Sequence, residues 1–194
     1  MRIALFFGSF NPVHNGHTGL GKYVVDNKLV DEVWFVVSPR NPLKNQRELI
    51  DEHQRFEMLQ LAIKDEPFFK ATDIEFKMPV PSYTIDTLHI LSSEFPEKHF
   101  VLMIGSDNAL VFEQWKNFKE ILSDYEIIVY PRQGFNFDLV KERFRQMKLA
   151  DTPIYNISST QIRDALRNTK DVSKWIHPSV FQYIKDNNLY SGVS

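Results

Sequence analysis

The segment that follows the first apolar run of the chain combines two histidines with two glycines. Residues 2–7 are mostly apolar and lead into Gly8-Ser9-Phe10-Asn11-Pro12-Val13-His14-Asn15-Gly16-His17. A short apolar run bounded by Gly and Pro predicts a buried strand, and a helix can begin near Gly16. A helical start puts His14 and His17 on one face, while the glycines let backbone approach a ligand closely. The pattern predicts two imidazole donors beside a helix N-terminus, where phosphates bind in open α/β sheets.

Two other interpretations of the histidine pair are open to test. One histidine could cap the helix while the other is buried in the core. A shared zinc ion would need a third protein ligand, and the chain has no cysteine. No other histidine or acid lies nearby at a ligand spacing, so we expect no metal bound by protein side chains.

A second candidate phosphate site lies near the C-terminus, in Ile157-Ser158-Ser159-Thr160-Gln161-Ile162-Arg163. Ser158 and Gln161, three residues apart, fit a capping box at the start of a helix. Free N–H groups, three hydroxyls and the fork of Arg163 suit a diphosphate or triphosphate. A well-capped surface helix with no ligand is the alternative, because Ser and Thr caps are common.

Size and composition narrow the class of protein. The chain has 194 residues, a net charge of −2, 16 Phe and no Cys. The length suits one α/β domain, residues 1–194, with a small helical C-terminal part from about residue 157. The charge argues against a general nucleic-acid binder, although local basic residues can still bind a nucleotide. Without cysteine, a secretion signal or a long apolar stretch, we expect a soluble cytoplasmic protein with no membrane partner.

The order of elements predicts how these motifs are positioned. Expected strands cover residues 2–7, 32–37, 69–76, 99–104, 125–130 and 154–157, and expected helices begin near residue 16 and cover residues 47–64, 85–91, 137–147, 159–167 and 178–185. Such alternation predicts an α/β fold, a Rossmann-like, doubly wound and mostly parallel sheet. The Gly-x-Gly-x-x-Gly fingerprint of dinucleotide binding is absent, so the ligand is not held as an oxidoreductase holds its cofactor.

These motifs resemble those of the nucleotidyltransferase superfamily with the His-x-Gly-His signature. The branch that they resemble is the bacterial nicotinate-nucleotide adenylyltransferases. Two further segments carry the resemblance, Pro81-Ser82-Tyr83-Thr84-Ile85-Asp86-Thr87-Leu88 and Gly105-Ser106-Asp107 with the Trp-containing helix start around Trp115. The resemblance spans nearly the whole chain.

By this resemblance, the two ends of the chain bind ATP. His14 and His17 contact the α- and β-phosphates, and Arg163 holds the β- and γ-phosphates. The remaining ATP contacts are Gly8, Ser9, Phe10, Gly16, Gly105, Asp107, Ser158, Ser159 and Thr160. Mg²⁺ arrives with ATP and keeps most of its waters, so the protein need not supply a carboxylate cage.

The same resemblance implies that residues in the middle of the chain bind nicotinate mononucleotide. Trp115 stacks on the pyridine ring, while Thr84 and the backbone N–H of Lys116 hold its carboxylate. Tyr83 also belongs to this pocket. The loop after the second strand departs from the family's Pro-His-Lys, because Leu43 stands at the His position. Lys44 remains to attract a phosphate.

The resemblance implies that the mononucleotide phosphate attacks the α-phosphorus of ATP directly, giving nicotinate adenine dinucleotide and pyrophosphate. That phosphate is already ionised at neutral pH, so alignment and charge neutralisation suffice. Alternative acceptors are nicotinamide mononucleotide and phosphopantetheine, and a non-catalytic nucleotide-binding regulator is the alternative outside enzymes. Whether the chain forms a homo-oligomer is left open.

Overall fold

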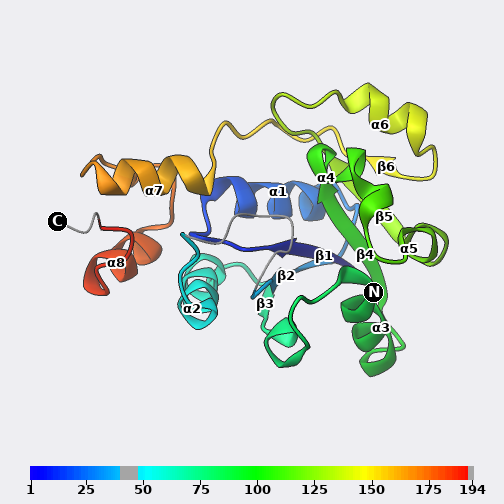
Figure 1. Ribbon diagram of the computed structural model, residues 1–194, viewed down its shortest axis with the longest axis horizontal. Helices are drawn as coiled ribbons and strands as arrows, with labels where there is room; N and C mark the ends of the chain where they lie inside the picture. Colours follow the sequence, from blue (N-terminus) through cyan, green and yellow to red (C-terminus); the bar gives the residue numbers. More distant parts are fainter. Residues whose placement is uncertain (40–47, 192–194) are drawn as a thin grey trace.

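Strands and helices alternate to build one parallel sheet between two layers of helices (Figure 1). The computed structural model describes residues 1–39 and 48–191. The strands are β1 (Arg2–Gly8), β2 (Glu32–Val37), β3 (Phe69–Thr72), β4 (His99–Gly105), β5 (Glu126–Tyr130) and β6 (Lys148–Leu149). The helices are α1 (Asn15–Asp26), α2 (Glu52–Ile63), α3 (Thr84–Glu94), α4 (Ser106–Leu110), α5 (Phe118–Asp124), α6 (Phe137–Arg143), α7 (Ser159–Arg167) and α8 (Pro178–Asp186), with the 3₁₀ turns η1 (Ile74–Lys77) and η2 (Phe112–Gln114).

The strand order is β3-β2-β1-β4-β5-β6, and every strand pair in this sheet is parallel. The chain therefore winds outward in one direction from β1 and in the other from β4. The carboxyl ends of β1 and β4 meet where the direction reverses, which is the usual ligand site of such sheets. The predicted Rossmann-like α/β fold is confirmed.

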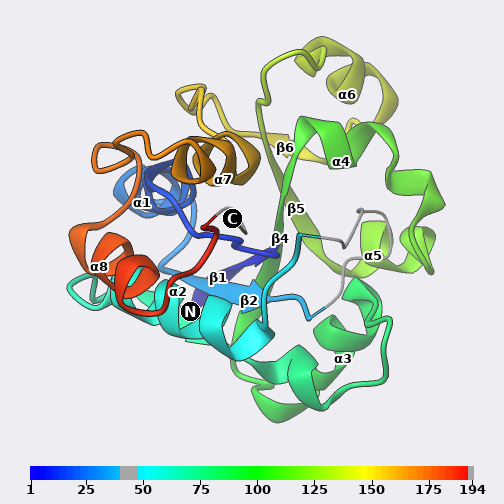
Figure 2. The ribbon, with the colours of Figure 1, turned by 60° about the vertical axis from the view of Figure 1, so that its left-hand side comes forward.

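Successive side chains along each strand point to opposite faces of the sheet, so the strands contribute to two hydrophobic cores, one on each face. On one face, Phe6, Phe35 and Met103 pack with α1, α2, α7 and α8. On the other face, Leu5 and Leu102 pack with α3 to α6. Figure 2 shows the sheet between these two groups of helices. The sheet is buried on both faces, so its strands read as continuous apolar runs.

The predicted strand over residues 154–157 is wrong. The sixth strand is Lys148–Leu149, and the backbone N–H of Ala150 still donates to Val129 O at 2.8 Å. Beyond it, Pro153 has no N–H with which to continue the ladder, and Ile154 is 52% exposed. Residues 150–157 instead cross the carboxyl edge of the sheet in an irregular conformation and lead into α7.

Three other predicted elements are shorter in the structure. The strand expected over 69–76 ends at Thr72, and η1 replaces its second half. The helix expected over 47–64 begins at Glu52, because the Asp51 carboxylate caps it by accepting from the His53 backbone N–H at 2.9 Å. The helix expected over 137–147 ends at Arg143.

Candidate active site

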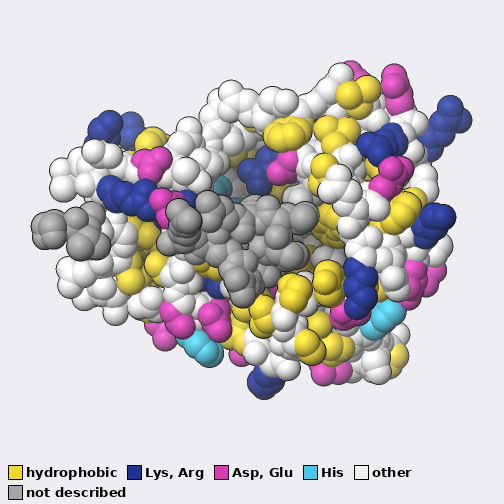
Figure 3. Space-filling model, in the orientation of Figure 1, with side chains coloured by type: hydrophobic (Ala, Val, Ile, Leu, Met, Phe, Trp, Pro, Cys, Tyr) yellow, Lys and Arg dark blue, Asp and Glu magenta, His cyan; other side chains and the backbone are white. Residues whose placement is uncertain are grey.

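One large cleft of about 1130 Å³ lies above the carboxyl ends of β1 and β4. Figure 3 shows it as a hollow with basic and acidic side chains on its wall. Most of the predicted site residues line it: Gly8, Ser9, Phe10, His14, His17, Tyr83, Thr84, Gly105, Asp107, Trp115, Lys116, Ser158, Ser159, Thr160 and Arg163. The structure thus brings together segments that lie at both ends and in the middle of the chain. Lys44 and Leu43 lie outside the described residues.

Gly8 and Gly16 make room for side chains of the site. A Cβ on Gly8 would lie 2.8 Å from the ring of Phe10. A Cβ on Gly16 would lie 3.0 Å from the His14 ring and 3.2 Å from Tyr155 Cβ. Gly16 does not line the large cleft. Its contact with ATP stays a prediction, whereas its packing against the His14 ring and Tyr155 Cβ is a structural reason for a glycine here.

The two histidines stack on each other at the start of α1. Their ring centroids are 3.7 Å apart, and the backbone N–H of His14 donates to Nδ1 of His17 at 3.2 Å. An Nδ1 that accepts a hydrogen bond leaves the proton of a neutral imidazole on Nε2. His17 can therefore offer Nε2–H as a donor. Phe10 and Phe6 contact the His17 ring edge-on, at 5.0 and 6.0 Å between centroids, and limit its rotation.

His14 is uncharged at neutral pH. Burial, with a smaller contribution from the nearby Arg132 charge, lowers the pKa of His14 from 6.5 to about 3. Only 5% of the residue is exposed, and its Nδ1 finds no hydrogen-bond partner among the described residues. His14 can therefore contribute only as a neutral donor, and arginines such as Arg132 and Arg163 bring positive charge to the cleft.

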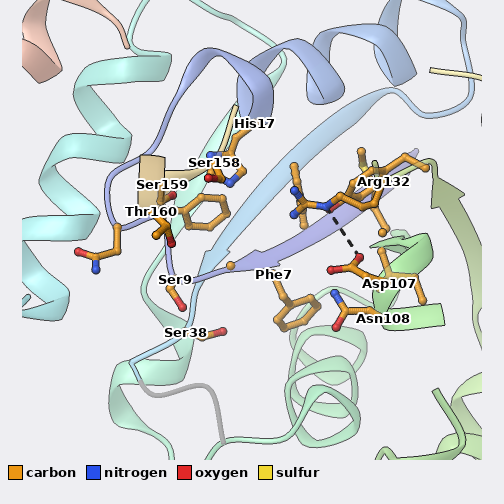
Figure 4. A pocket seen from close by; sticks show the side chains of 18 of the residues that line it. Phe7, Ser9, His17, Ser38, Asp107, Asn108, Arg132, Ser158, Ser159 and Thr160 are labelled. Atoms are coloured by element: carbon orange, nitrogen blue, oxygen red, sulfur yellow. Dashed lines mark ion pairs between the residues drawn. The ribbon is translucent and has the colours of Figure 1, made fainter. Parts of the chain in front are cut away.

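The predicted capping box at α7 is present. Ser158 Oγ accepts from the Gln161 backbone N–H at 3.2 Å, and Gln161 Oε1 accepts from the Ser158 N–H at 2.9 Å. Ser159 Oγ donates to Pro12 O at 2.9 Å, which ties the start of α7 to the turn after β1. The three hydroxyl residues lie beside His17 in Figure 4. The two candidate phosphate sites are thus one site.

Arg163 reaches this site, and its charge is already paired. Its guanidinium donates to Asn11 O at 2.9 Å and to the Glu48 carboxylate at 2.8 Å. Arg167 binds the other Glu48 oxygen at 2.8 Å. The two arginines hold the pKa of Glu48 below its ordinary value, so this carboxylate is an anion. Glu48 therefore occupies the fork that we expect a phosphate to occupy.

The other end of the cleft contains the predicted acceptor residues. Trp115 follows η2 and packs on Phe112 at 5.2 Å between centroids; α5 begins only at Phe118, so the Trp-containing helix start is a 3₁₀ turn and a linker. Tyr83 precedes α3 and its side chain caps none of the N–H groups of the first turn, whereas its carbonyl oxygen accepts from the Asp86 N–H at 3.0 Å. Lys116 Nζ pairs with Asp86 at 2.8 Å and lies 4.8 Å from the centre of the Tyr83 ring.

Arg132 was not predicted from the sequence, yet it lies in the middle of the cleft. Its Nε is 3.8 Å from Asp107 Oδ1, and both atoms are buried without a hydrogen-bond partner among the described residues (Figure 4). A Cβ on Gly105 would collide with Asp107 Oδ1 and lie 3.0 Å from Arg132 Cγ, so Gly105 makes room for this pair. Its place in the sequence could have indicated this, because Arg132 lies two residues after the end of β5, whose carboxyl end borders that of β4.

Arg55, from α2, also escaped prediction. It is fully buried and donates to Ser9 O at 2.7 Å, Ser38 O at 2.8 Å and Pro39 O at 3.0 Å. It therefore joins the backbone after β1 to the backbone after β2. The sequence spacing could have indicated that Arg55 is buried. Met58 and Leu59 follow it by three and four residues, so all three lie on the same apolar face of the helix.

No three His, Asp or Glu side chains among the described residues gather into a group that could hold a metal ion. Within the same residues, no helix is both long and apolar enough to cross a membrane.

Comparison with known proteins agrees with this geometry. The sequence matches the Cytidylyltransferase-like family over residues 5–165. It is 46% identical over 183 residues to a protein of Bacteroides fragilis named "probable nicotinate-nucleotide adenylyltransferase", covering 94% of this chain and 90% of that one. A protein of the same name from Flavobacterium psychrophilum is 41% identical, covering 98% and 99%.

Solved structures show the same fold. Nicotinic acid mononucleotide adenylyltransferase of Plasmodium falciparum, complexed with NaAD, superposes with a TM-score of 0.83 at 23% identity and covers 97% of both chains. The fold, the matched family and the close bacterial relatives agree: this chain belongs to the nicotinate-nucleotide adenylyltransferases, within the cytidylyltransferase-like family.

Proposed function

We propose that the cleft transfers the adenylyl group of ATP to nicotinate mononucleotide, a step of NAD biosynthesis, releasing pyrophosphate. The observation that carries the proposal is that one continuous cleft contains both the histidine–arginine site and the Trp115–Thr84 end. A nucleotide triphosphate and a mononucleotide can therefore lie end to end with their phosphates in the middle. The nicotinate-nucleotide adenylyltransferase names of the relatives support the same substrates.

The reaction needs alignment and charge compensation rather than a base. A phosphate oxygen of the mononucleotide is already ionised and attacks the α-phosphorus of ATP in line, as the bond to the bridging oxygen breaks and pyrophosphate leaves. No covalent enzyme intermediate forms. Holding both phosphates within reach makes the step effectively intramolecular, which lowers the barrier substantially.

The phosphate end supplies neutral donors and one arginine. His17 Nε2–H and the uncharged His14 donate to the α- and β-phosphates. Arg163 takes the β- and γ-phosphates after they displace Glu48, and the N–H groups at the start of α7 add donors. ATP is taken as its Mg²⁺ complex, in which phosphate oxygens and water can serve as the metal's ligands.

At the acceptor end, Trp115 stacks on the pyridine ring, with Tyr83 beside it. The uncapped first turn at Thr84 and the N–H of Lys116 receive the ring carboxylate. Between the two ends, Asp107 and Gly105 face the ribose of ATP, and Arg132 adds a cation next to the reacting phosphates. Lys44 is proposed to attract a phosphate.

We assign the whole of residues 1–194 to a single catalytic domain. We place the reaction in the cytoplasm, a reducing compartment that suits a chain without cysteine.

The test is pyrophosphate release from ATP and Mg²⁺ with three acceptors compared: nicotinate mononucleotide, nicotinamide mononucleotide and 4′-phosphopantetheine. We expect the highest kcat/KM with the nicotinate form. Preference for another acceptor would overturn the assignment of the acceptor end but keep the chemistry. ATP binding without turnover of any acceptor would overturn the proposal and favour a regulator.

A further inference from the structure

Glu75 brings a buried carboxyl group to the wall of the cleft and has no part in the reaction described above. It lies on η1, is 2% exposed, and lines the cleft together with Tyr83 and Thr84. Burial raises the pKa of Glu75, and hydrogen bonds from Ser82, Thr87 and Ser38 oppose that rise. Because a buried carboxylate is costly unless it is hydrogen-bonded, these hydroxyls and Glu75 form one unit.

The two strongest of these bonds bracket Thr84. Ser82 Oγ donates to Glu75 Oε2 at 2.8 Å, from the extended segment just before α3. Thr87 Oγ1 donates to Glu75 Oε1 at 2.8 Å, from the first turn of the helix. One carboxylate therefore fixes the chain two residues before Thr84 and three residues after it.

Hydrogen bonds to a residue outside the helix, such as Glu75, can add stability to the start of α3. Its N-cap residue, Tyr83, makes no side-chain cap, so the helix closes its first turn only through the Tyr83 carbonyl oxygen, which accepts from the Asp86 N–H at 3.0 Å and the Thr87 N–H at 3.2 Å. A side chain that capped this turn would also occupy the N–H groups that a ligand carboxylate requires. Glu75 holds the turn from the side through hydroxyls and leaves those N–H groups uncovered.

We infer that Glu75 is a positioning residue that sets the first turn of α3 for the pyridine carboxylate of the mononucleotide. The inference rests on the proposed function, since it assumes that Thr84 receives that carboxylate. Glu75 acts through Ser82 and Thr87 and touches no reacting atom. It therefore controls binding at one end of the cleft and leaves ATP binding unaffected.

The test compares Glu75→Gln, Thr87→Val and Thr87→Ser in steady-state pyrophosphate release. Glu75→Gln leaves one acceptor oxygen for two hydroxyls, and Thr87→Val removes one donor at nearly constant volume. We expect each to raise KM for nicotinate mononucleotide about tenfold, the scale of one lost hydrogen bond. KM for ATP should stay within about twofold. Thr87→Ser keeps the hydroxyl and should keep the wild-type KM.

The selectivity between the two mononucleotides gives a second readout, which a simple loss of protein stability would not change. The ratio of kcat/KM for nicotinate over nicotinamide mononucleotide should fall in Glu75→Gln and Thr87→Val. Ser92→Ala is the matched control, because it removes a hydrogen bond to Tyr125 at the other end of the same helix. It should lower Tm without changing the ratio.

Two outcomes would overturn the inference. If wild type turns over the nicotinate form while both variants lose only Tm and keep KM and selectivity, Glu75 merely supports the core. If wild type does not use the nicotinate form, the proposed function fails and the inference fails with it. Ser82→Ala, at a half-buried position, provides the same comparison if Glu75→Gln does not fold.

Discussion

The two ends of the cleft are prepared for their ligands in opposite ways. At the phosphate end, three of the groups that should meet ATP are already bonded within the protein, Arg163 to Glu48 and the Ser158 and Ser159 hydroxyls to backbone, and His14 Nδ1 is the exception among the described residues. At the acceptor end and in the middle, buried polar atoms of Trp115, Asp107 and Arg132 have no hydrogen-bond partner among the described residues, although Asp107 and Arg132 form an ion pair at 3.8 Å.

This difference shows what each ligand must supply. In the proposed function, ATP displaces the Glu48 carboxylate from Arg163 and so exchanges one charge pair for another. The rest of the cleft instead presents buried polar atoms that lack a hydrogen-bond partner among the described residues, and a ligand that bonds to them relieves the cost of burying them unpaired. We therefore expect substitutions at the phosphate end to act mainly on kcat or on KM for ATP. Substitutions at the acceptor end should act mainly on KM for the mononucleotide.

The largest expected effect is that of His17→Ala. Removing a donor aimed at charge that develops in the transition state costs about 10²-fold or more in kcat. His89→Ala, at an exposed histidine of α3, is the control and should leave kcat unchanged. A His17→Ala variant with nearly wild-type kcat would remove His17 from the chemistry and would leave Arg163 as the main contact of the phosphate end.

His14 predicts a pH effect on stability at the same end. Its pKa is about 3 in the folded protein and near 6.5 when unfolded, so between these values only the unfolded chain binds the proton. Folding stability from this group is therefore complete above about pH 6.5 and falls by about 1.4 kcal/mol for each pH unit below it.

Urea unfolding at several pH values between 7.5 and 5 measures this slope. His14→Gln should flatten the slope relative to wild type, whereas His53→Gln, at an exposed histidine of α2, should not. Equal slopes in wild type and His14→Gln would mean that His14 is protonated in the folded protein and meets phosphate as a cation.

The acceptor end is tested by Trp115→Ala. Stacking on the pyridine ring is similar in the ground and transition states, so KM for the mononucleotide should rise about tenfold while kcat changes little. Trp115→Phe retains an aromatic face and should restore most of the affinity. A rise in KM for ATP instead would place Trp115 at the adenine and reverse the proposed orientation of the two ligands.

The comparison also explains which parts of the site the sequence could predict. Ser158 and Gln161 are three residues apart, and a capping box depends on that local spacing alone, so its prediction is confirmed. The meeting of the histidine segment with Asp107 and Trp115 follows from the topology of a parallel sheet, whose strand ends share one edge.

Contacts between distant residues have no such local signal. Glu48 and Arg163 are 115 positions apart, and Arg132 meets Asp107 across two strand ends. Nothing in the spacing of either pair indicates the contact. The strand predicted over residues 154–157 failed for a related reason, because its apolar residues resemble a buried strand while the sheet edge is already completed by Lys148–Leu149. The local sequence pattern predicted the donors at the phosphate end. Only the tertiary structure shows that one of them, Arg163, already binds the Glu48 carboxylate.

The smallest expected effect is that of Glu48→Gln, which tests the occupied fork directly. If Glu48 stands where phosphate binds, removing its charge leaves Arg163 more available, and KM for ATP should fall roughly two- to fivefold at low salt. The decrease in KM should become smaller as the salt concentration rises, since both partners are partly exposed and screened.

Asp164→Asn is the matched control, because Asp164 pairs with Arg167 at 3.1 Å and makes no ion pair with Arg163 among the described residues. If KM for ATP instead rises in Glu48→Gln and not in Asp164→Asn, Glu48 holds Arg163 in its binding position, and both ends of the cleft are then organised by a buried or paired carboxylate.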